Sequence, residues 1–277
     1  MLNPFKTFNH AHWESQLQDL AQAYQSAEPF PHIVLERFIV EEALEKAHQE
    51  FLSQQSDAWI HYAHFNEKKR GLKKLEYFPP TIKALVHELN SEAFCRFLSQ
   101  LTSIEGLLSD PLLEGGGMHE SFRGGFLNIH ADFGSHPYQA HWRRRVNVLI
   151  YLNEGWKDDY GGHLELWSRD MKARIKKIAP LFNRCVVFST DATSYHGHPE
   201  PMTCPEHISR KSIALYYFTE EKKPLKVQST QYRARPADGL KTILIWGDTQ
   251  LIRAYTTLKR WTGLKDESVK KALKFFS

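Results

Sequence analysis

The chain of 277 residues lacks three features, each of which would have assigned it to a particular class of protein. It has no run of 18 uncharged apolar residues, and its first residues, Met-Leu-Asn-Pro-Phe-Lys-Thr, contain no apolar core of a signal peptide. Its three cysteines, Cys95, Cys185 and Cys204, are too few and too scattered for a disulfide framework or a thiolate zinc site. The sequence therefore predicts a cytoplasmic protein with reduced thiols.

An excess of charge of one sign is also missing from the chain as a whole. The formal net charge is +4, with 42% hydrophobic and 25% charged residues, which is typical of a soluble globular protein. The basic charge is uneven, because residues 221–277 hold 13 Lys+Arg against 5 Asp+Glu. Since no nucleic-acid motif or internal repeat accompanies it, we expect no nucleic-acid partner. A solvated helical face is favoured for this segment over an acidic-partner site or a peripheral membrane contact.

The spacing of apolar residues changes twice along the chain and divides one predicted domain, 1–277, into three parts. Residues 1–114 show helical spacing at 11–27, at 41–54 and after Pro79-Pro80, with a strand at 31–38. Residues 221–277 return to a helical pattern, with an apolar stripe, a cap at Gly263 and a short basic helix at 266–276. The stripe consists of Leu244, Leu251, Tyr255 and Leu258.

The middle part, residues 115–220, predicts the fold class. It contains short β-rich runs separated by clusters of Gly, Pro, Asn and Asp, at 125–131, 146–152, 163–167, 185–189 and 212–218. Short strands with turn signals and no long helix between them favour an antiparallel sandwich or barrel over a parallel sheet. We therefore expect an α+β protein with a mainly β core, N-terminal supporting helices and a basic, helical C-terminal extension. A barrel of this kind offers a mouth for a ligand.

The most informative residues are His130 and Asp132, which share one face of the predicted strand at 125–131. A neutral imidazole and a carboxylate are two of the three ligands of the triad that holds non-haem Fe(II). A lone His-x-Asp is weak evidence, because about one is expected by chance in such a chain. Formally similar His-x-Glu pairs begin at His12, His48, His163 and His198.

A third ligand and an anion anchor follow later in the sequence. His196 and His198 come just after the strand at 185–189, so His196 has only to face His130 and Asp132 to complete a triad. Iron in such a site needs an electron source, which a 2-oxo acid supplies as it decarboxylates. Arg210 opens the last β-rich run, where a guanidinium can hold the distal carboxylate in a two-point contact. Its neighbour Lys211 should face the opposite way, toward solvent.

With these residues the chain resembles the Fe(II)/2-oxoglutarate-dependent dioxygenase superfamily, in its prolyl-4-hydroxylase-like branch. The resemblance covers most of the chain and rests on an ordered series of segments, 29–38, 115–119, 124–133, 144–153, 160–167 and 182–188. It implies a double-stranded β-helix, which is a jelly-roll or cupin-like barrel.

The resemblance also implies roles for individual residues. His130, Asp132 and His196 would be the iron ligands, while Arg210 and Tyr151 would bind the distal carboxylate of 2-oxoglutarate. Two further residues, Leu149 and Leu164, would be apolar walls around the co-substrate chain. The chain departs from many relatives at Leu127, where some have a tyrosine, and at His198, where many have a small aliphatic residue. Asp132 argues against the halogenating relatives, which lack this carboxylate.

The implied activity is that of a dioxygenase that uses O2, Fe(II) and 2-oxoglutarate, with ascorbate as an optional reductant. It would hydroxylate a C–H bond of a peptidyl proline, a glycan or another small molecule, and release succinate and CO2. The alternatives are a cupin-like metal isomerase, a non-catalytic sugar-binding barrel, or an oxygenase fold that serves only as a scaffold. The aromatic segment 134–143 is either a substrate lid or an ordered surface loop. The oligomeric state is left open.

Overall fold

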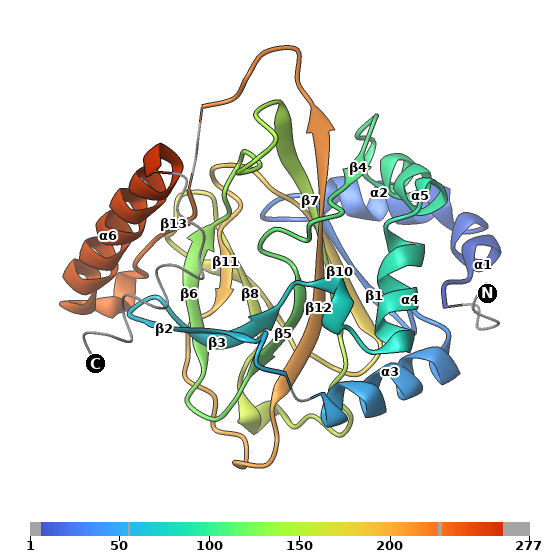
Figure 1. The fold of residues 1–277 in the computed structure, drawn as a ribbon, viewed down its shortest axis with the longest axis horizontal. Coiled ribbons are helices and arrows are strands. Elements are labelled where there is room, and N and C mark those ends of the chain that lie inside the picture. The colour runs from blue at the N-terminus through green and yellow to red at the C-terminus, as the bar shows by residue number, and fades with distance from the viewer. Residues whose placement is uncertain (1–6, 55, 227–228, 263–277) are drawn as a thin grey trace.

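The computed structural model describes residues 7–54, 56–226 and 229–262 (Figure 1). Its helices are α1 (His10–Glu14), α2 (Leu17–Ser26), α3 (Glu41–Ser53), α4 (Pro80–Leu89), α5 (Glu92–Thr102) and α6 (Lys241–Thr262), with short 3-10 turns at Leu75–Tyr77, Asp158–Tyr160 and Pro236–Asp238. Its strands are β1 (His32–Glu36), β2 (Ile60–His64), β3 (Glu67–Leu72), β4 (Leu108–Ser109), β5 (Gly117–Ser121), β6 (Phe126–Ala131), β7 (Trp142–Tyr151), β8 (Leu164–Trp167), β9 (Arg174–Ile178), β10 (Arg184–Ser189), β11 (His196–His198), β12 (Arg210–Glu220) and β13 (Gln231–Tyr232).

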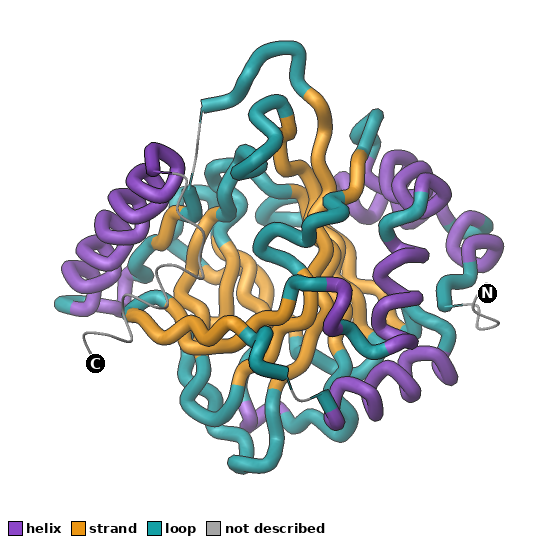
Figure 2. Tube along the Cα trace, viewed as in Figure 1, coloured by secondary structure: helices purple, strands orange, loops and turns teal. Residues whose placement is uncertain are grey.

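All of these strands belong to one sheet of 13 strands, in which every pairing is antiparallel. The main path runs β1-β10-β7-β12-β5-β3-β6-β11-β8-β9, while β2, β4 and β13 pair with β3, β12 and β6. The helices lie on two flanks, with the strands between them (Figure 2). The expected mainly β, antiparallel core with supporting helices is thus confirmed.

Strand β7 shows why the middle of this sheet is buried on both faces. Val146, Val148 and Ile150 pack with side chains of α1 to α5 in the larger core. Leu149 and Tyr151 alternate with them and face a smaller apolar cluster on the inner side of the sheet. Each large apolar side chain buried in this way contributes about 1.5–3 kcal/mol of stability. The helical layer therefore holds the strands whose other face forms the pocket.

Helices α4 and α5 follow the local signals of the sequence. Pro80 occupies the first turn of α4, where its missing N–H costs nothing. Helix α5 begins after Ser91, whose side chain accepts a hydrogen bond from the Phe94 amide, and ends at Ser103 in the left-handed conformation. The helical spacing expected after Pro79-Pro80 is confirmed, and the buried positions are Ile82, Leu85, Val86, Leu89, Phe94, Phe97 and Leu98.

The hairpin of β2 and β3 is an element that the sequence did not predict. Its second strand carries the charged run 67–70, which as a sequence is typical of an exposed segment. In the structure β3 lies between β5 and β6, so that alternate residues of this run point into the curled sheet. Apart from β2, its pairing partners lie about 50 or more residues away in sequence, and no local pattern predicts these pairings.

Helix α6 confirms a helical segment after residue 240 but contacts the sheet through a different face. Ile245 and Thr249 are 2% and 4% exposed, whereas Leu244 and Leu251 of the expected stripe are 51% and 71% exposed. The side chains of Tyr255 and Leu258, and the residues 263–277 with the expected cap and basic helix, lie outside the described part. Among the described residues, no helix is long and apolar enough to span a bilayer.

A charged contact fixes α6 to the turn between β2 and β3. The His64 ring lies 2.9 Å from Asp248 of α6 through Nδ1 and 3.0 Å from Glu67 through Nε2. Both partners are acceptors, so the contact is complete only when both ring nitrogens carry a proton. Burial alone would lower the pKa of His64, but the carboxylates of Glu67 and Asp248 outweigh it and raise the pKa. The Tyr232 ring, 6.3 Å away, closes the remaining side.

Raising the pH should loosen this contact. Because the pKa of His64 is raised in the folded state, its stabilising effect is complete below the ordinary value of 6.5 and is lost as pH rises through the folded pKa. We expect hydrogen-exchange protection factors in the β2–β3 turn and the start of α6 to fall with rising pH. A His64→Gln variant should show no such pH step, and His61→Gln, at an exposed position of β2, should keep it. Equal pH dependence in all three proteins would contradict this account.

Candidate active site

The curled sheet encloses a cavity of about 190 Å³, and most of the residues singled out in the sequence line it. These are His130, Asp132, His196, Arg210, Leu149 and Leu164. Tyr151 is fully buried and contacts Arg210 from behind, with its hydroxyl 3.2 Å from a guanidinium nitrogen. The structure therefore brings together residues that lie up to 80 positions apart in the chain.

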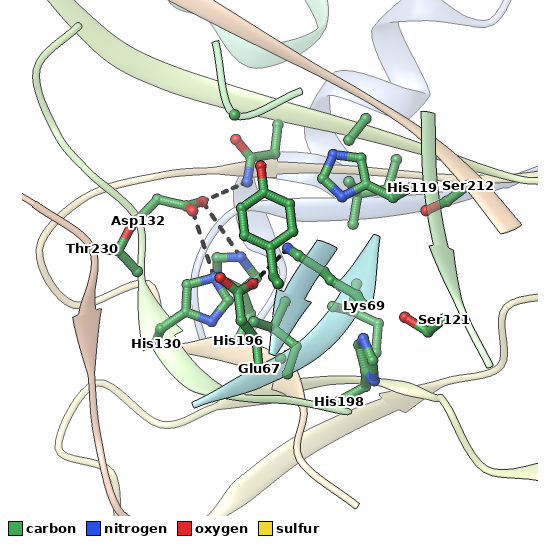
Figure 3. A pocket seen from close by; sticks show the side chains of 18 of the residues that line it. Glu67, Lys69, His119, Ser121, His130, Asp132, His196, His198, Ser212 and Thr230 are labelled. Carbon is green, nitrogen blue, oxygen red and sulfur yellow. Dashed lines mark hydrogen bonds and ion pairs between the residues drawn. The ribbon is translucent and has the colours of Figure 1, made fainter. Parts of the chain in front are cut away.

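His196 reaches the His130–Asp132 pair because β11 pairs with β6. The register sets His196 opposite His130, and the two ring centroids are 4.5 Å apart. Gly197 permits this close approach, since a Cβ there would lie 2.7 Å from the carbonyl oxygen of Leu127. The three side chains point toward one another (Figure 3), and each offers a ligand atom within 4.8 Å of the others.

Backbone carbonyls orient the two imidazoles of this cluster. The Nδ1 atom of His130 lies 2.9 Å from the Asn128 carbonyl, and that of His196 lies 2.9 Å from the Ser194 carbonyl. An Nδ1–H donor leaves the Nε2 lone pair free, and both Nε2 atoms face Asp132 at 3.6 and 3.4 Å. Burial lowers the pKa of His196 to about 4, so this ring is neutral at physiological pH. Two imidazoles and one carboxylate are a donor set that fits a divalent transition metal.

Arg144 and Asn147 of β7 hold the carboxylate of this cluster. The Oδ2 atom of Asp132 accepts a hydrogen bond of 2.7 Å from Asn147 and lies 2.9 Å from an Arg144 guanidinium nitrogen. Arg144 also donates to Asn147 at 2.9 Å and stacks over the Tyr216 ring. Burial alone would raise the pKa of Asp132, but the Arg144 guanidinium and the His196 ring hold it well below its usual value. Asp132 is therefore charged, and its Oδ2 atom is held by Asn147 and Arg144.

Arg210 lies at the other end of the cavity and has no anionic partner among the described residues. It is 6% exposed and donates to the Gly162 carbonyl at 2.7 Å and to the Tyr151 hydroxyl at 3.2 Å. Gly162 has a φ of +68°, and a Cβ there would lie 2.9 Å from the Arg210 side chain. A buried guanidinium without a carboxylate is costly unless a ligand completes it. Its planar donors fit a carboxylate in a two-point contact.

Two further histidines, His119 and His198, line the cavity without being part of the metal cluster. Burial, with a contribution from the charge of Lys69, lowers the pKa of His119 to about 3. Burial and the charge of Arg210 likewise hold the pKa of His198 well below its usual value. The Nε2 atom of His119 and the Nδ1 atom of His198 are buried and have no hydrogen-bond partner. Both rings are thus neutral groups with unused hydrogen-bonding capacity.

The competing histidine pairs have other partners. His163 lies 2.6 Å from Asp158, and Glu165 binds Arg174 and the Trp167 indole, so this pair is not directed at a common metal position. His48 lies 2.7 Å from the carbonyl oxygen of Leu152. Within the described part of the chain, the group of His130, Asp132 and His196 has metal-ligand geometry. The three cysteines are free and buried.

The prediction that Lys211 faces solvent is wrong. Lys211 is 6% exposed, and its ammonium donates to the Ser209 carbonyl at 3.2 Å. Alternation does turn it away from Arg210, but the outer side of β12 is itself covered at this point. The Asn153 side chain accepts from the Lys211 amide at 2.6 Å. Burial lowers the pKa of Lys211, although the nearby carboxylate of Glu120 opposes this effect.

Several residues of the cavity wall escaped the sequence interpretation. Lys69 and Glu67 enter from β3, Arg144 from β7, and aromatic rings form much of the remaining wall. Charged residues in a short strand gave no sign of an inward position, because their inward direction depends on the long-range pairing of β3. The aromatic members are Tyr62, Phe133, Tyr216 and Tyr232.

The segment 134–143 does not line the cavity, although its neighbours Phe133 and Arg144 do. His136 is 2% exposed, stacks edge-on against Phe218 at 5.2 Å and lies 3.3 Å from Asp110. Tyr138, by contrast, is 59% exposed. One side of this loop is therefore anchored to the body of the protein, and its tip is presented to solvent.

Removing Arg144 should destabilise the protein mainly through Asp132. In Arg144→Met the buried carboxylate loses its cation, and we expect a loss of about 3–5 kcal/mol in urea unfolding. A bound divalent metal would restore a positive charge next to Asp132, so saturating Mn(II) should reduce this loss. The matched control Arg143→Met breaks only the half-exposed pair with Glu221 and should cost at most about 1 kcal/mol. A loss in Arg144→Met that is unchanged by Mn(II) would contradict the arrangement described.

Comparison with known proteins agrees with this geometry. Residues 117–218 match the family model of the 2OG-Fe(II) oxygenase superfamily. The chain is 28% identical over 203 residues to the mouse prolyl 3-hydroxylase OGFOD1. The aligned region covers 69% of this chain and 33% of that protein. It thus spans about a third of the length of this relative.

Solved structures show the same fold at low sequence identity. A prolyl hydroxylase from Trichoplax adhaerens, in complex with a hypoxia-inducible factor peptide fragment, superposes with a TM-score of 0.56 at 19% identity, over 78% of this chain and 94% of that one. A Pseudomonas putida prolyl-4-hydroxylase gives 0.51 at 16% identity, over 73% and 99%. The double-stranded β-helix is confirmed. Residues 117–218 of the chain thus resemble the 2OG-Fe(II) oxygenase superfamily, and its fold is like that of prolyl hydroxylases.

Proposed function

We propose that this protein is an Fe(II)- and 2-oxoglutarate-dependent dioxygenase that hydroxylates a C–H bond of its substrate. One observation carries the proposal: a His-Asp-His cluster of metal-ligand geometry opens into the same cavity as a buried arginine that has no carboxylate partner in the described part of the chain. His130, Asp132 and His196 would hold the metal. Arg210 would bind the distal carboxylate of 2-oxoglutarate, with the Tyr151 hydroxyl beside it. A cupin-like isomerase or a sugar-binding barrel has no need of such an anchor.

When bound, Fe(II) and 2-oxoglutarate activate O2, and the reaction yields succinate, CO2 and a hydroxylated product. The protein supplies position and environment. The carbonyl-bound imidazoles of His130 and His196 direct their Nε2 atoms toward Asp132, and Arg144 keeps Asp132 charged. Leu149 and Leu164 line the cavity, and they would exclude water from the apolar middle of the co-substrate.

We propose a proline-containing peptide as the substrate class. The mouse relative is named a prolyl 3-hydroxylase, and the Trichoplax prolyl hydroxylase was solved with a peptide fragment. The aromatic lining of the cavity by Tyr62, Phe133, Tyr216 and Tyr232 supports this choice, since aromatic side chains give a saturated ring a large apolar contact area.

We also propose that the three parts, 1–114, 115–220 and 221–277, form a single oxygenase domain. The sheet supports this, because it takes β1 to β4 from the first part, β5 to β12 from the second and β13 from the third. Strand β13 contributes Tyr232 to the cavity wall, so the pocket draws on the C-terminal part as well.

Removing a proposed ligand should abolish both metal binding and turnover. We expect the wild-type protein to bind one Mn(II) in calorimetry and, with Fe(II), to release succinate from 2-oxoglutarate. His196→Ala should do neither, because two ligands bind such an ion far more weakly than three. The control His163→Gln alters a buried histidine just before β8 that contacts Asp158, and it should leave both readouts unchanged. The assignment would be lost if His196→Ala bound Mn(II) as tightly as the wild type.

Removing the anchor should abolish co-substrate binding and spare the metal. We expect Arg210→Ala to weaken 2-oxoglutarate binding to the Mn(II)-loaded protein roughly a hundredfold, because charge-assisted hydrogen bonds contribute about 1.5–3 kcal/mol each. Tyr151→Phe removes one hydroxyl and should cost less. Since no described carboxylate pairs with Arg210, its removal leaves no buried anion behind. Unchanged 2-oxoglutarate affinity in Arg210→Ala would favour the cupin-like alternatives.

A further inference from the structure

Lys69 is a buried cation in the cavity to which the proposed reaction so far gives no task. It enters from β3, and its ammonium lies 3.0 Å from the Glu67 carboxylate, with the two side chains 15% and 11% exposed. Burial alone would lower the pKa of Lys69, but Glu67, together with Tyr216 and Asp132, outweighs it and raises the pKa. Lys69 is therefore charged inside the cavity. Its side chain extends toward Glu67 and the His-Asp-His cluster (Figure 3).

The charge of Lys69 acts on both ends of the cavity. At the metal end it interacts with Asp132, which favours the charged ammonium. At the other end, burial is the main cause that lowers the pKa of His198, and the charges of Arg210 and Lys69 lower it further. Burial and the charge of Lys69 likewise lower the pKa of His119. Lys69 lines the same cavity as the proposed metal ligands and the proposed distal anchor.

The donors of this ammonium are only partly used. An ammonium has three N–H donors, and among the described residues Glu67 takes one of them. The other two cations of the cavity are already assigned, because Arg144 holds Asp132 and Arg210 lies at the far end. Lys69 is therefore the charged donor left for a ligand atom at the metal end.

A 2-oxo acid bound to a metal presents such an atom. The carboxylate next to its 2-oxo group would give one oxygen to the metal. The other oxygen of this carboxylate would be removed from water, and its lone pairs would need a hydrogen-bond donor from the protein. An unpaired carboxylate oxygen in a dry cavity is costly, whereas a charged donor makes a short and strong hydrogen bond.

We propose that Lys69 is a second anion anchor, which binds the metal-proximal carboxylate of the 2-oxo acid while Arg210 binds the distal one. The inference rests on the proposed function and assigns the two ends of the co-substrate to two cations from different strands, β3 and β12. Glu67 then weakens ligand binding, because it also pairs with the Lys69 ammonium and so lowers the attraction of this ammonium for the ligand carboxylate.

The test measures binding of 2-oxoglutarate to the Mn(II)-loaded protein by calorimetry, without turnover. We expect Lys69→Met to weaken binding roughly tenfold to a hundredfold, in line with one charge-assisted hydrogen bond. The matched control Lys68→Met, at the exposed neighbouring position of β3, should have no effect. Because Lys69→Met leaves the buried Glu67 carboxylate with the His64 ring but without its ammonium partner, the double variant Glu67→Gln/Lys69→Met provides a form without that charge and should show the same weakening.

Two further arms separate an anchor from a structural ion pair. Glu67→Gln alone should tighten 2-oxoglutarate binding if Lys69 contacts the ligand, whereas a structural pair predicts weaker binding in both single variants. The second arm uses 2-oxopentanoate, which lacks the distal carboxylate. Lys69→Met should weaken its binding by the same factor as that of 2-oxoglutarate, and Arg210→Ala should leave its binding unchanged.

The outcomes separate the two proposals. If Lys69→Met and the double variant bind 2-oxoglutarate like the wild type, the anchor is refuted while the proposed function stands. The same holds if Glu67→Gln weakens binding as Lys69→Met does. If the wild type with Mn(II) binds neither 2-oxo acid, the proposed function and the anchor fail together.

Discussion

The pairing of β6 with β11 is the interaction on which the rest of the site depends. It sets His196 opposite His130, so that two imidazoles from strands more than 60 residues apart face the same carboxylate. The two strands come close only because residue 197 is a glycine. A register shift of one residue would turn His196 to the other face of the sheet. The helical layer matters to function because its core holds β7 and β12, the strands that bring Arg144 and Arg210 into the same cavity.

A second constraint is that the inside of the sheet holds charge where water is scarce. Asp132, Glu67, Arg144, Arg210 and Lys69 all line one cavity. Two of the cations have a carboxylate partner, and Arg210 has none among the described residues. Buried charges are stable only when they are paired or coordinated. The arrangement is therefore best explained as a site that a metal ion and a dianion complete.

The sequence predicted the parts of the site that short-range patterns encode. Alternation set His130 and Asp132 on one face, and the run after residue 185 supplied His196. The roles of Tyr151, Leu149 and Leu164 came from resemblance alone, since a strand tyrosine or leucine has no chemistry of its own. The structure places Leu149 and Leu164 on the cavity wall and Tyr151 behind Arg210.

What could not be predicted depends on contacts that are distant in sequence. Lys69 is charged and stands in a charged run, and only the insertion of β3 between β5 and β6 turns it inward. The prediction that Lys211 faces solvent was wrong for the same reason. Alternation indicates the direction of a side chain along a strand, but it does not indicate which segments cover that side of the sheet. In α6 the apolar stripe at Leu244 and Leu251 is real, yet the helix contacts the sheet through Ile245 and Thr249.

The central claim is that His130, Asp132 and His196 hold Fe(II) while a 2-oxo acid chelates it in the same cavity. Anaerobic visible spectroscopy tests this most directly, because a 2-oxo acid chelated to Fe(II) gives a metal-to-ligand charge-transfer band that neither component gives alone. The account predicts that this band appears when 2-oxoglutarate is added to the Fe(II)-loaded protein and saturates at one equivalent. Absence of the band in a protein that still binds Fe(II), or its persistence in His130→Ala, would contradict the claim.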